Sequence, residues 1–472
     1  MSAQETYENV EKSLQERGQS HLLAFWEQLD ADRRLDLLAQ IQRLDLTKID
    51  QWMADLVKKP TFTPNCANFT PATSYSPDPA GPEQQGKYAK AIELGRELIS
   101  TGKVAAFVVA GGQGIRLGFD GPKGNFHISP VRNRTLFQIF ADSIAAVSRK
   151  YRTVCPWYVM TSRLNYDRTV EIFRSNDYYG LDEKNVFFFQ QGTLPNLDPD
   201  GRILLADKNT IACSPDGHGG SLKALHQSGA IEDMKNRGVE FLSYFQVDNA
   251  LINIFDPLFI GLHVLDNAEM SSKAVIKTRP KEKVGNFCLI DGKVNVIEYS
   301  DLPDELAERR NSDQSLVFQF GSIAIHIINR TFVERLNAGD FALPLHRAVK
   351  KIHHIDDQGN SVESDGIKLE SFVFDALPLA SNSVILQTRR SEEFAPTKNR
   401  TGVDSVETTR QMITNRAADW LEWAGVTVPR KSDGSVDCLL EIAPSFALEK
   451  EDIREKLSQI PEIKLGDSIY LA

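Results

Sequence analysis

The feature that most constrains the fold is an unbroken apolar run, Val104–Ala110, which ends abruptly in Gly111-Gly112-Gln113-Gly114. A continuous apolar strand of this length is typical of a parallel sheet that is covered on both faces. Glycines at the carboxyl end of such a strand let the backbone adopt positive φ and bring several N–H groups close to a ligand. The run therefore predicts an α/β fold with an anion-binding turn at the edge of its sheet.

Helical and strand-like segments alternate after this run. The helical patterns are Leu136–Val147 and Tyr166–Arg174, and the strand-like runs are Trp157–Met160, Val186–Phe189 and Phe241–Val247. Such alternation indicates a doubly wound, Rossmann-like core. Later runs are shorter and hairpin-like, so we expect a mixed sheet; these runs are Lys273–Lys277, Phe287–Ile290, Lys293–Tyr299 and Val317–Ile328.

The pattern changes on both sides of this core. Apolar residues recur at spacings of three and four from Leu22 to Leu44, which predicts amphipathic helices. Six of the 21 prolines lie from Pro60 to Pro82 and predict an extended linker, followed by a helix through Lys87–Ser100 with Gly102 as its C-cap. Near the end we expect a helix through Trp423, a strand at Cys438–Ile442 and a helix at Lys450–Leu457. The predicted regions are 1–100, helical with a Pro-rich linker; 101–400, the α/β domain; and 401–472, a small C-terminal domain.

Composition argues against several classes of function. The chain has 472 residues and a formal net charge of −10, which argues against a basic face that binds long nucleic acid. Its five cysteines are widely spaced, so neighbours cannot form a disulfide framework or a CxxC zinc site. The first residues lack a secretion-signal pattern, and no apolar stretch approaches the roughly 20 residues of a membrane span. We therefore expect a cytoplasmic, soluble protein that binds small ligands.

Two familiar nucleotide-binding loops do not fit the glycine segment. A dinucleotide fingerprint would need a third glycine where Leu117 stands and an acidic residue after the next apolar stretch, Phe126–Ile128. A Walker loop would need four residues between its first glycine and Gly-Lys-Ser/Thr. Arg116 and Lys123 would add positive charge to the backbone donors of a phosphate cradle. A merely structural tight turn remains the alternative.

Gly111-Gly-Gln-Gly-x-Arg-Leu-Gly118, followed by Pro122-Lys-Gly124, resembles the signature loop of the UDP-sugar pyrophosphorylases, specifically of the UDP-N-acetylglucosamine pyrophosphorylase branch. The resemblance implies a Rossmann-like, mixed-sheet nucleotidyltransferase core of the GT-A-like kind in residues 101–400, with UTP and a sugar 1-phosphate as substrates and Mg²⁺ as cofactor. It covers roughly residues 20–400 and is carried by further motifs in the family's order, which are Pro215–Gly220, Gln246–Asn249, Lys277–Gly285, Glu298–Ser300, Gly366–Asp375 and Glu392–Asn399.

The resemblance also implies roles for residues that bind the nucleotide and the metal. Gln191 would read the uracil edge with backbone groups at Gly111, Gly112 and Gly217, and an amide suits this because it offers both a donor and an acceptor. Asp248 follows an apolar strand, so its carboxylate would lie at the sheet edge as a Mg²⁺ ligand. The structural alternative for Gln191 is a polar residue at a strand end that is hydrogen-bonded within the protein. The alternative for Asp248 is an exposed turn after a strand.

Arg116, Lys123 and Lys398 would be the catalytic cations. Attack by the sugar-phosphate oxygen on the α-phosphorus builds negative charge on the equatorial and leaving oxygens, and fixed cations stabilise that charge. Because a sugar 1-phosphate is already anionic near neutral pH, no covalent nucleophile or strong general base is needed. The expected catalysis is therefore positioning plus electrostatics.

The identity of the sugar is less clear from the sequence. Two residues depart from the usual pattern of the N-acetylglucosamine enzymes: His218 and Ser322 both stand where asparagine is usual, and His218 resembles the Gly-His-Gly of glucose-using relatives. We expect N-acetylglucosamine 1-phosphate as acceptor; the alternatives are glucose 1-phosphate or broad specificity and, from another class, an inactive UDP-sugar-binding regulatory protein. The expected sugar-binding residues are His218, Gly285, Glu298, Ser322, Phe372 and Phe374. The alternative for Phe372 and Phe374 is that they are ordinary aromatic core residues of a strand.

Overall fold

The computed structural model describes residues 3–57 and 68–472, so residues 60–67 of the predicted proline-rich linker lie outside the described residues. The chain forms two compact units. The smaller unit contains residues 1–65, 192–221 and 343–373, and the larger contains residues 66–191, 222–342 and 374–472. The three regions predicted from the sequence stay a prediction.

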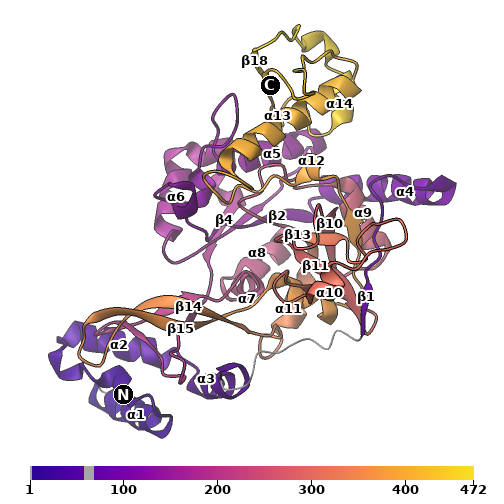
Figure 1. The fold of residues 1–472 in the computed structure, drawn as a ribbon. Helices are drawn as coiled ribbons and strands as arrows, with labels where there is room; N and C mark the ends of the chain where they lie inside the picture. The colour runs from indigo at the N-terminus through magenta and orange to yellow at the C-terminus, as the bar shows by residue number, and fades with distance from the viewer. Residues whose placement is uncertain (1–2, 58–67) are drawn as a thin grey trace. The chain divides into compact units, whose positions relative to one another are not determined.

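The centre of the larger unit is a 10-stranded sheet, whose labelled strands lie side by side in Figure 1. Four of its strands are parallel neighbours in the order β9-β2-β3-β4, as the apolar run predicted. Their bounds are β2 Val104–Val109, β3 Trp157–Thr161, β4 Val186–Gln190 and β9 Phe241–Gln246.

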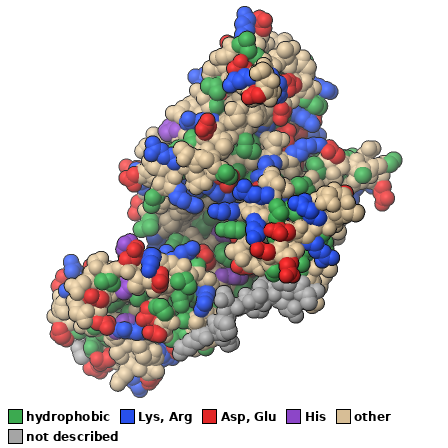
Figure 2. Space-filling model, viewed as in Figure 1, with side chains coloured by type: hydrophobic (Ala, Val, Ile, Leu, Met, Phe, Trp, Pro, Cys, Tyr) green, Lys and Arg blue, Asp and Glu red, His purple; other side chains and the backbone are tan. Residues whose placement is uncertain are grey.

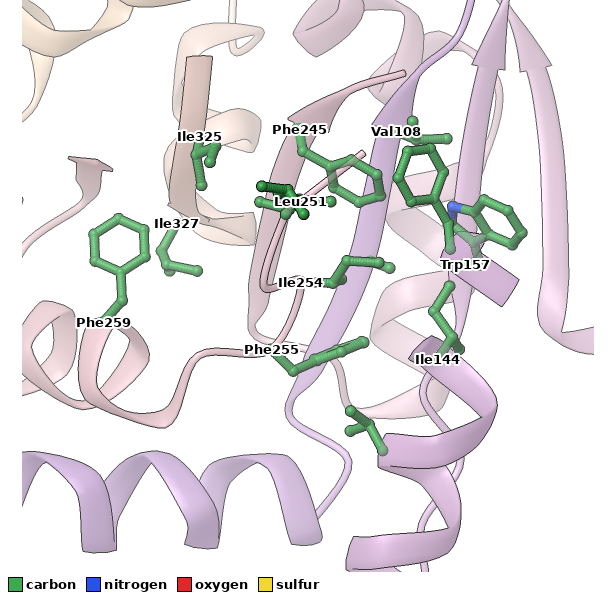
Figure 3. Packing of buried hydrophobic residues seen from close by; sticks show 14 of the residues in the cluster. Val108, Ile144, Trp157, Phe245, Leu251, Ile254, Phe255, Phe259, Ile325 and Ile327 are labelled. Carbon is green, nitrogen blue, oxygen red and sulfur yellow. The ribbon is translucent and has the colours of Figure 1, made fainter. Parts of the chain in front are cut away.

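Both faces of this parallel part are covered. On one face, Val108, Trp157 and Phe245 pack with Ile144 of α5 (Leu136–Tyr151), and Figure 3 shows these side chains converging. On the other face, Phe107 packs edge to face against Tyr244, and the Tyr158 hydroxyl donates to Asp233 of α8 (Ala230–Arg237). Burial on both faces explains why the strand sequences are continuously apolar rather than alternating.

The other half of the sheet is antiparallel, so the prediction of a mixed sheet is confirmed. β13 (Phe320–Asn329) pairs antiparallel with β10 along one side and, on the other side, with β11 near its start and with β9 near its end. The remaining strands are β1 Phe69–Pro71, β10 Met270–Ile276, β11 Gly285–Ile290, β12 Lys293–Ile297 and β16 Ile385–Gln387.

Two glycines let a pair of helices approach closely beside this sheet. A Cβ at Gly95 of α4 (Gly81–Ser100) would lie 1.9 Å from the Pro257 carbonyl oxygen, and one at Gly261 of α9 (Pro257–Leu265) would lie 1.8 Å from that of Ala91.

α4 begins six residues before the predicted Lys87, because Pro82 suits the first helical turn. Its predicted stop is confirmed: Gly102, with φ +70°, follows Thr101 at the C-cap. The other helices of at least seven residues here are α6 Tyr166–Ser175, α7 Gly220–Gln227, which begins in the smaller unit, and α11 Arg330–Leu336.

The C-terminal segment has a hydrophobic cluster of its own. Leu421 of α13 (Val406–Trp423) packs with Leu440 of β17 (Leu439–Ile442) and Ile453 of α14 (Lys450–Arg454). β17 pairs in parallel with β18 (Ser468–Leu471). The predicted helix and strand are confirmed here, although the last helix ends at Arg454 rather than at Leu457.

The smaller unit combines helices with a long β-ribbon. Its helices are α1 Ala3–Glu16, α2 Ala31–Gln42 and α3 Leu46–Trp52, and its ribbon pairs β14 (His346–Ile355) with β15 (Ser361–Glu370). Two short strand pairs complete it, β5 (Thr193–Pro195) with β8 (Cys213–Pro215) and β6 (Leu205–Asp207) with β7 (Thr210–Ile211). The prediction of α-helix from Leu22 was wrong for its first part, because residues 20–28 form two 3₁₀ turns that bury Leu22 and Phe25 against other segments.

Lys and Arg side chains alternate with Asp and Glu over the face shown in Figure 2. Among the described residues, no helix is long and apolar enough to cross a membrane.

Candidate active site

The glycine-rich loop after β2 is held by its own backbone. Gly114 N–H donates to Gly121 O at 2.9 Å, and Lys123 N–H donates to Gly112 O at 3.0 Å. Gly118 has φ +72°, which an L side chain rarely adopts. A Cβ at Gly112 would meet nothing within 4 Å, so the loop leaves open space above this backbone position. The predicted turn therefore exists and leaves room for a ligand.

The structure brings together four of the predicted site residues at the carboxyl edge of the parallel strands. Lys123 Nζ lies 3.9 Å from Asp248 Oδ2, and these side chains are only 10% and 14% exposed. Burial lowers the pKa of Lys123; Asp248 opposes this, and the charges of Arg116 and Lys398 lower it further. The charges of Arg116 and Lys398 thus act on Lys123, and the carboxylates that face the two lysines are Asp248 at Lys123 and Asp404 at Lys398.

The segment that carries Lys398 is fastened to Asp248 by backbone and side-chain hydrogen bonds. Thr397 N–H donates to the Asp248 carbonyl at 2.8 Å. The buried Asn249 amide donates to Glu393 O at 2.7 Å and accepts from Ala395 N–H at 2.9 Å. Sequence reasoning assigned no role to Asn249, although a polar residue that ends a core strand was a usable signal. These bonds place Lys398 next to the end of β9.

Gln191 and Gly111, both predicted to bind the uracil, lie against each other. Gln191 follows β4, and its N–H donates to Thr161 O at 2.7 Å. A Cβ at Gly111 would lie 3.2 Å from Gln191 Oε1 and 3.2 Å from Ser162 N, so a larger residue would displace the amide. Asn165, which the sequence analysis missed, donates to Ala110 O at 3.1 Å and so braces the same loop.

Gly285, Glu298 and Ser322 form a second group in the larger unit. Gly285 of β11 is opposite Ser322 of β13, and a Cβ at Gly285 would lie 3.8 Å from Glu298 Oε1. β13 carries a register shift opposite Ser272 and Ala274, with Ala324 at φ +54°. Bulges of this kind redirect side chains next to functional sites, and this one follows Ser322 directly.

Gly217, His218 and Phe372 belong to the smaller unit. A Cβ at Gly217 would lie 2.2 Å from Ser371 O, so only glycine fits there. His218 Nδ1 accepts a hydrogen bond from Val373 N–H at 3.0 Å, and burial lowers the pKa of His218 to about 4. The imidazole is therefore neutral near pH 7, with its proton on Nε2 as a donor. The Phe372 ring stacks on His346 at 4.7 Å and lies 5.3 Å from His218.

Phe374 belongs to the larger unit. It lies in the 3₁₀ helix Val373–Leu379 and is 7% exposed. The two aromatic residues predicted for the sugar pocket thus have different surroundings, with Phe372 in a ring stack and Phe374 buried at a helix start.

Comparison with known proteins identifies the family. The family described as UTP–glucose-1-phosphate uridylyltransferase matches residues 81–470. The chain belongs to this family. It is 37% identical to UDP-N-acetylhexosamine pyrophosphorylase-like protein 1 of Homo sapiens, over 89% of this chain and 86% of the relative. It is 33% identical to UDP-N-acetylglucosamine pyrophosphorylase of Saccharomyces cerevisiae, over 93% and 95%.

A solved structure of the uridine diphosphate N-acetylglucosamine pyrophosphorylase from Trypanosoma brucei has the same fold as this uridylyltransferase-family chain. Its TM-score is 0.81 at 24% sequence identity, with 100% of this chain and 98% of that chain covered. The predicted α/β nucleotidyltransferase fold is thereby confirmed.

The donors in this uridylyltransferase-family site suit a magnesium ion that is bound mainly by substrate. Among residues 3–57 and 68–472, no group of three or more His, Cys, Asp or Glu side chains could hold a metal. Asp248 supplies one hard carboxylate oxygen. Mg²⁺ in nucleotide sites commonly takes one or two carboxylates and completes its octahedron with phosphates and water. The single carboxylate therefore fits Mg²⁺ and does not fit a structural zinc site.

Proposed function

We propose that this chain transfers the uridylyl group of UTP to N-acetylglucosamine 1-phosphate, with release of pyrophosphate. The observation that carries the proposal is the placement of Lys123 beside Asp248, with Arg116 and Lys398 close enough to perturb the Lys123 pKa. This arrangement supplies fixed positive charge around one potential metal ligand at the end of a glycine-rich loop.

The reaction needs the chain to orient two anions and stabilise charge. A phosphate oxygen of the sugar 1-phosphate forms a bond to the α-phosphorus of UTP, while the bond from that phosphorus to the α,β-bridging oxygen breaks. Pyrophosphate leaves with the electron pair, and no proton transfer to the protein is required. Lys123 and Lys398 would stabilise the developing negative charge, because their positions are set before the reaction begins. Mg²⁺ held through Asp248 would neutralise phosphate charge when bound.

The acceptor is proposed from the names of the relatives and from the pocket residues. Two relatives that cover most of the chain are named for N-acetylhexosamine or N-acetylglucosamine. Ser322 of the larger unit has a shorter side chain than asparagine and so leaves more space beside it. A pocket that has room for the N-acetyl group but no amide that hydrogen-bonds it separates the two sugars mainly by space. Such a pocket changes the ratio of their kcat/KM values by roughly 10- to 200-fold. We therefore propose a preference for N-acetylglucosamine 1-phosphate over glucose 1-phosphate that is modest rather than absolute.

A panel of sugar 1-phosphates tests this function directly. Purified protein is mixed with UTP, MgCl₂ and N-acetylglucosamine, N-acetylgalactosamine, glucose or galactose 1-phosphate, and pyrophosphate release is measured. N-acetylglucosamine 1-phosphate should give the highest kcat/KM. A higher kcat/KM for glucose 1-phosphate would support the glucose alternative instead.

The same panel separates an enzyme from a silent binding protein. Bound UDP-N-acetylglucosamine without pyrophosphate release from any acceptor would support a regulatory UDP-sugar-binding protein. A cytoplasmic location is part of the proposal, and it is supported by the free thiols of Cys155 and Cys438.

A further inference from the structure

A loop near the proposed phosphate site presents a cation that the family motifs do not include. Residues 399–403 form a turn closed by its own hydrogen bonds: Asn399 N–H donates to Asp404 O at 3.0 Å, and Asn399 Nδ2 donates to Val403 O at 2.7 Å. Arg400 follows Asn399 within this turn and is exposed. The closed turn gives Arg400 a defined backbone position two residues after Lys398.

The Arg400 loop is joined to the glycine-rich loop. Arg400 N–H donates to the Arg116 carbonyl at 3.1 Å. Its side chain also folds over Gly118: a Cβ there would lie 3.5 Å from Arg400 Cδ and 3.6 Å from Nη1. Backbone and side chain together place the Arg400 guanidinium on the loop that carries Arg116.

In the part of the chain that the structure describes, neither Arg116 nor Arg400 forms an ion pair with an acidic side chain. The nearby lysines differ, since Lys123 lies 3.9 Å from Asp248 and Lys398 lies 3.9 Å from Asp404. An exposed guanidinium without a counterion can take an anion, because Arg binds phosphate oxygens through parallel N–H donors.

We propose that Arg400, together with Arg116, binds the β- and γ-phosphates of UTP and the pyrophosphate they become. The inference rests on the proposed uridylyl transfer and adds a residue to it. Arg116 perturbs the pKa of Lys123, whereas Arg400 is not among the described charges that do so. The Arg400 guanidinium lies instead over Gly118, at the end of the loop that also carries Arg116. UDP-sugars lack these two phosphates, so the role predicts a difference between ligands.

Binding measurements with three variants test the proposal. Arg400→Ala should raise the Kd for UTP and for pyrophosphate by about 10- to 100-fold, the range expected for losing a charge-assisted hydrogen bond. The Kd for UDP-N-acetylglucosamine should change less than about twofold, and Arg400→Lys should recover part of the loss. Arg149→Ala is the matched control, since it removes an exposed arginine from the last turn of α5. It should leave all three constants unchanged.

Two results would overturn the proposal. Unchanged binding of pyrophosphate and UTP in Arg400→Ala would show that the side chain does not contact these phosphates. Equal weakening of UTP and UDP-N-acetylglucosamine would show that Arg400 only supports the loop at Gly118. Failure of the proposed function is recognised separately, because the wild-type protein would then release no pyrophosphate with any acceptor. The Kd values for pyrophosphate could still be compared between the wild type and the variants.

Discussion

Lys123 Nζ lies 3.9 Å from Asp248 Oδ2, although the two residues come from different loops at the carboxyl edge of the sheet. The distance is longer than a hydrogen bond, so each side chain keeps capacity for another partner. A phosphate at the lysine and a cation at the carboxylate would satisfy both. The pair is therefore placed to bind a metal–nucleotide complex rather than only to stabilise the fold.

Asp248→Asn should remove metal-dependent turnover while the protein stays folded. The amide keeps the size of the side chain but loses the negative charge that a hard cation prefers. Activity is measured against MgCl₂ concentration, and folding is followed by circular dichroism and Tm. Wild-type activity of the variant at limiting Mg²⁺ would show that Asp248 is not a metal ligand.

Lys123→Ala and Lys398→Ala should each lower kcat by on the order of 100- to 1,000-fold, as for the loss of one preorganised donor. Both cations would stabilise charge that appears only in the transition state. Steady-state kinetics with each variant separate kcat from KM. A rise in KM with unchanged kcat would mean that these lysines bind substrate and transition state equally.

Turnover should fall on the alkaline side at a pH below the ordinary lysine pKa of 10.5. Burial lowers the pKa of Lys123, so this cation becomes neutral earlier than an exposed lysine as pH rises. The unfolded chain then binds more protons than the folded one between the two pKa values, so stability from this group rises with pH in that window. The pH profile of kcat/KM, which reports the groups of the free enzyme, checks the first point, and Lys123→Arg should move the alkaline loss upward. The same alkaline limb in both proteins would exclude Lys123 as its source.

Ser322→Asn and His218→Asn should sharpen the preference for N-acetylglucosamine 1-phosphate over glucose 1-phosphate. An added amide would hydrogen-bond the N-acetyl group and would remain unpaired with glucose, and such sites can discriminate by up to about 10⁴–10⁵. The measurement is the ratio of kcat/KM for the two acceptors in each single variant and in the double variant. An unchanged ratio in all three would place neither residue at the N-acetyl group.

Lys273→Met should destabilise the larger unit by about 3–5 kcal/mol, because it leaves buried carboxylates without a cation. Lys273 is 1% exposed, and its Nζ lies 2.6 Å from Asp256 Oδ2 and 2.6 Å from Glu393 Oε2. Burial lowers the pKa of Lys273, but the two carboxylates more than offset this, so the pKa is raised overall and the group stays charged. Urea denaturation measures the change in the free energy of unfolding.

Lys103→Met is the control for this substitution, since Lys103 pairs with Glu240 near the surface, and its stability should be nearly unchanged. Asp256 is also the N-cap of α9, where its side chain accepts from the Leu258 and Phe259 N–H groups. Replacing Lys273 and Glu393 by Met and Asp256 by Asn in one protein should recover most of the lost stability, because asparagine keeps this cap while the buried charges are removed. Equal losses in the single and triple variants would contradict the unpaired-charge explanation.

The local elements of the core could be predicted from the sequence because they depend on neighbouring residues. The apolar run Val104–Ala110 predicts a buried strand and the glycines after it predict a tight turn, and both occur in the structure. Positive φ occurs later in the loop, at Gly118 and Gly121, and not at Gly111, Gly112 or Gly114. The amphipathic spacing before α2 was less reliable. Leu22 and Phe25 have helical spacing, yet packing against other segments draws them into 3₁₀ turns.

The assembly of the candidate site could be anticipated only through the family resemblance. The local sequence around Lys123 and Lys398 does not predict that these residues lie close together. Their proximity depends on the strand order β9-β2-β3 and on the hydrogen bonds between Asn249 and residues 393–395. The side chain of Arg400 likewise became relevant only when its loop was seen to bond to Arg116. The sequence alone determined which segments are strands, helices and glycine turns, because these follow from hydrophobic periodicity and local backbone sterics. Only the tertiary structure decided which charges share one edge of the sheet, because that follows from strand pairing and burial between segments far apart in the chain.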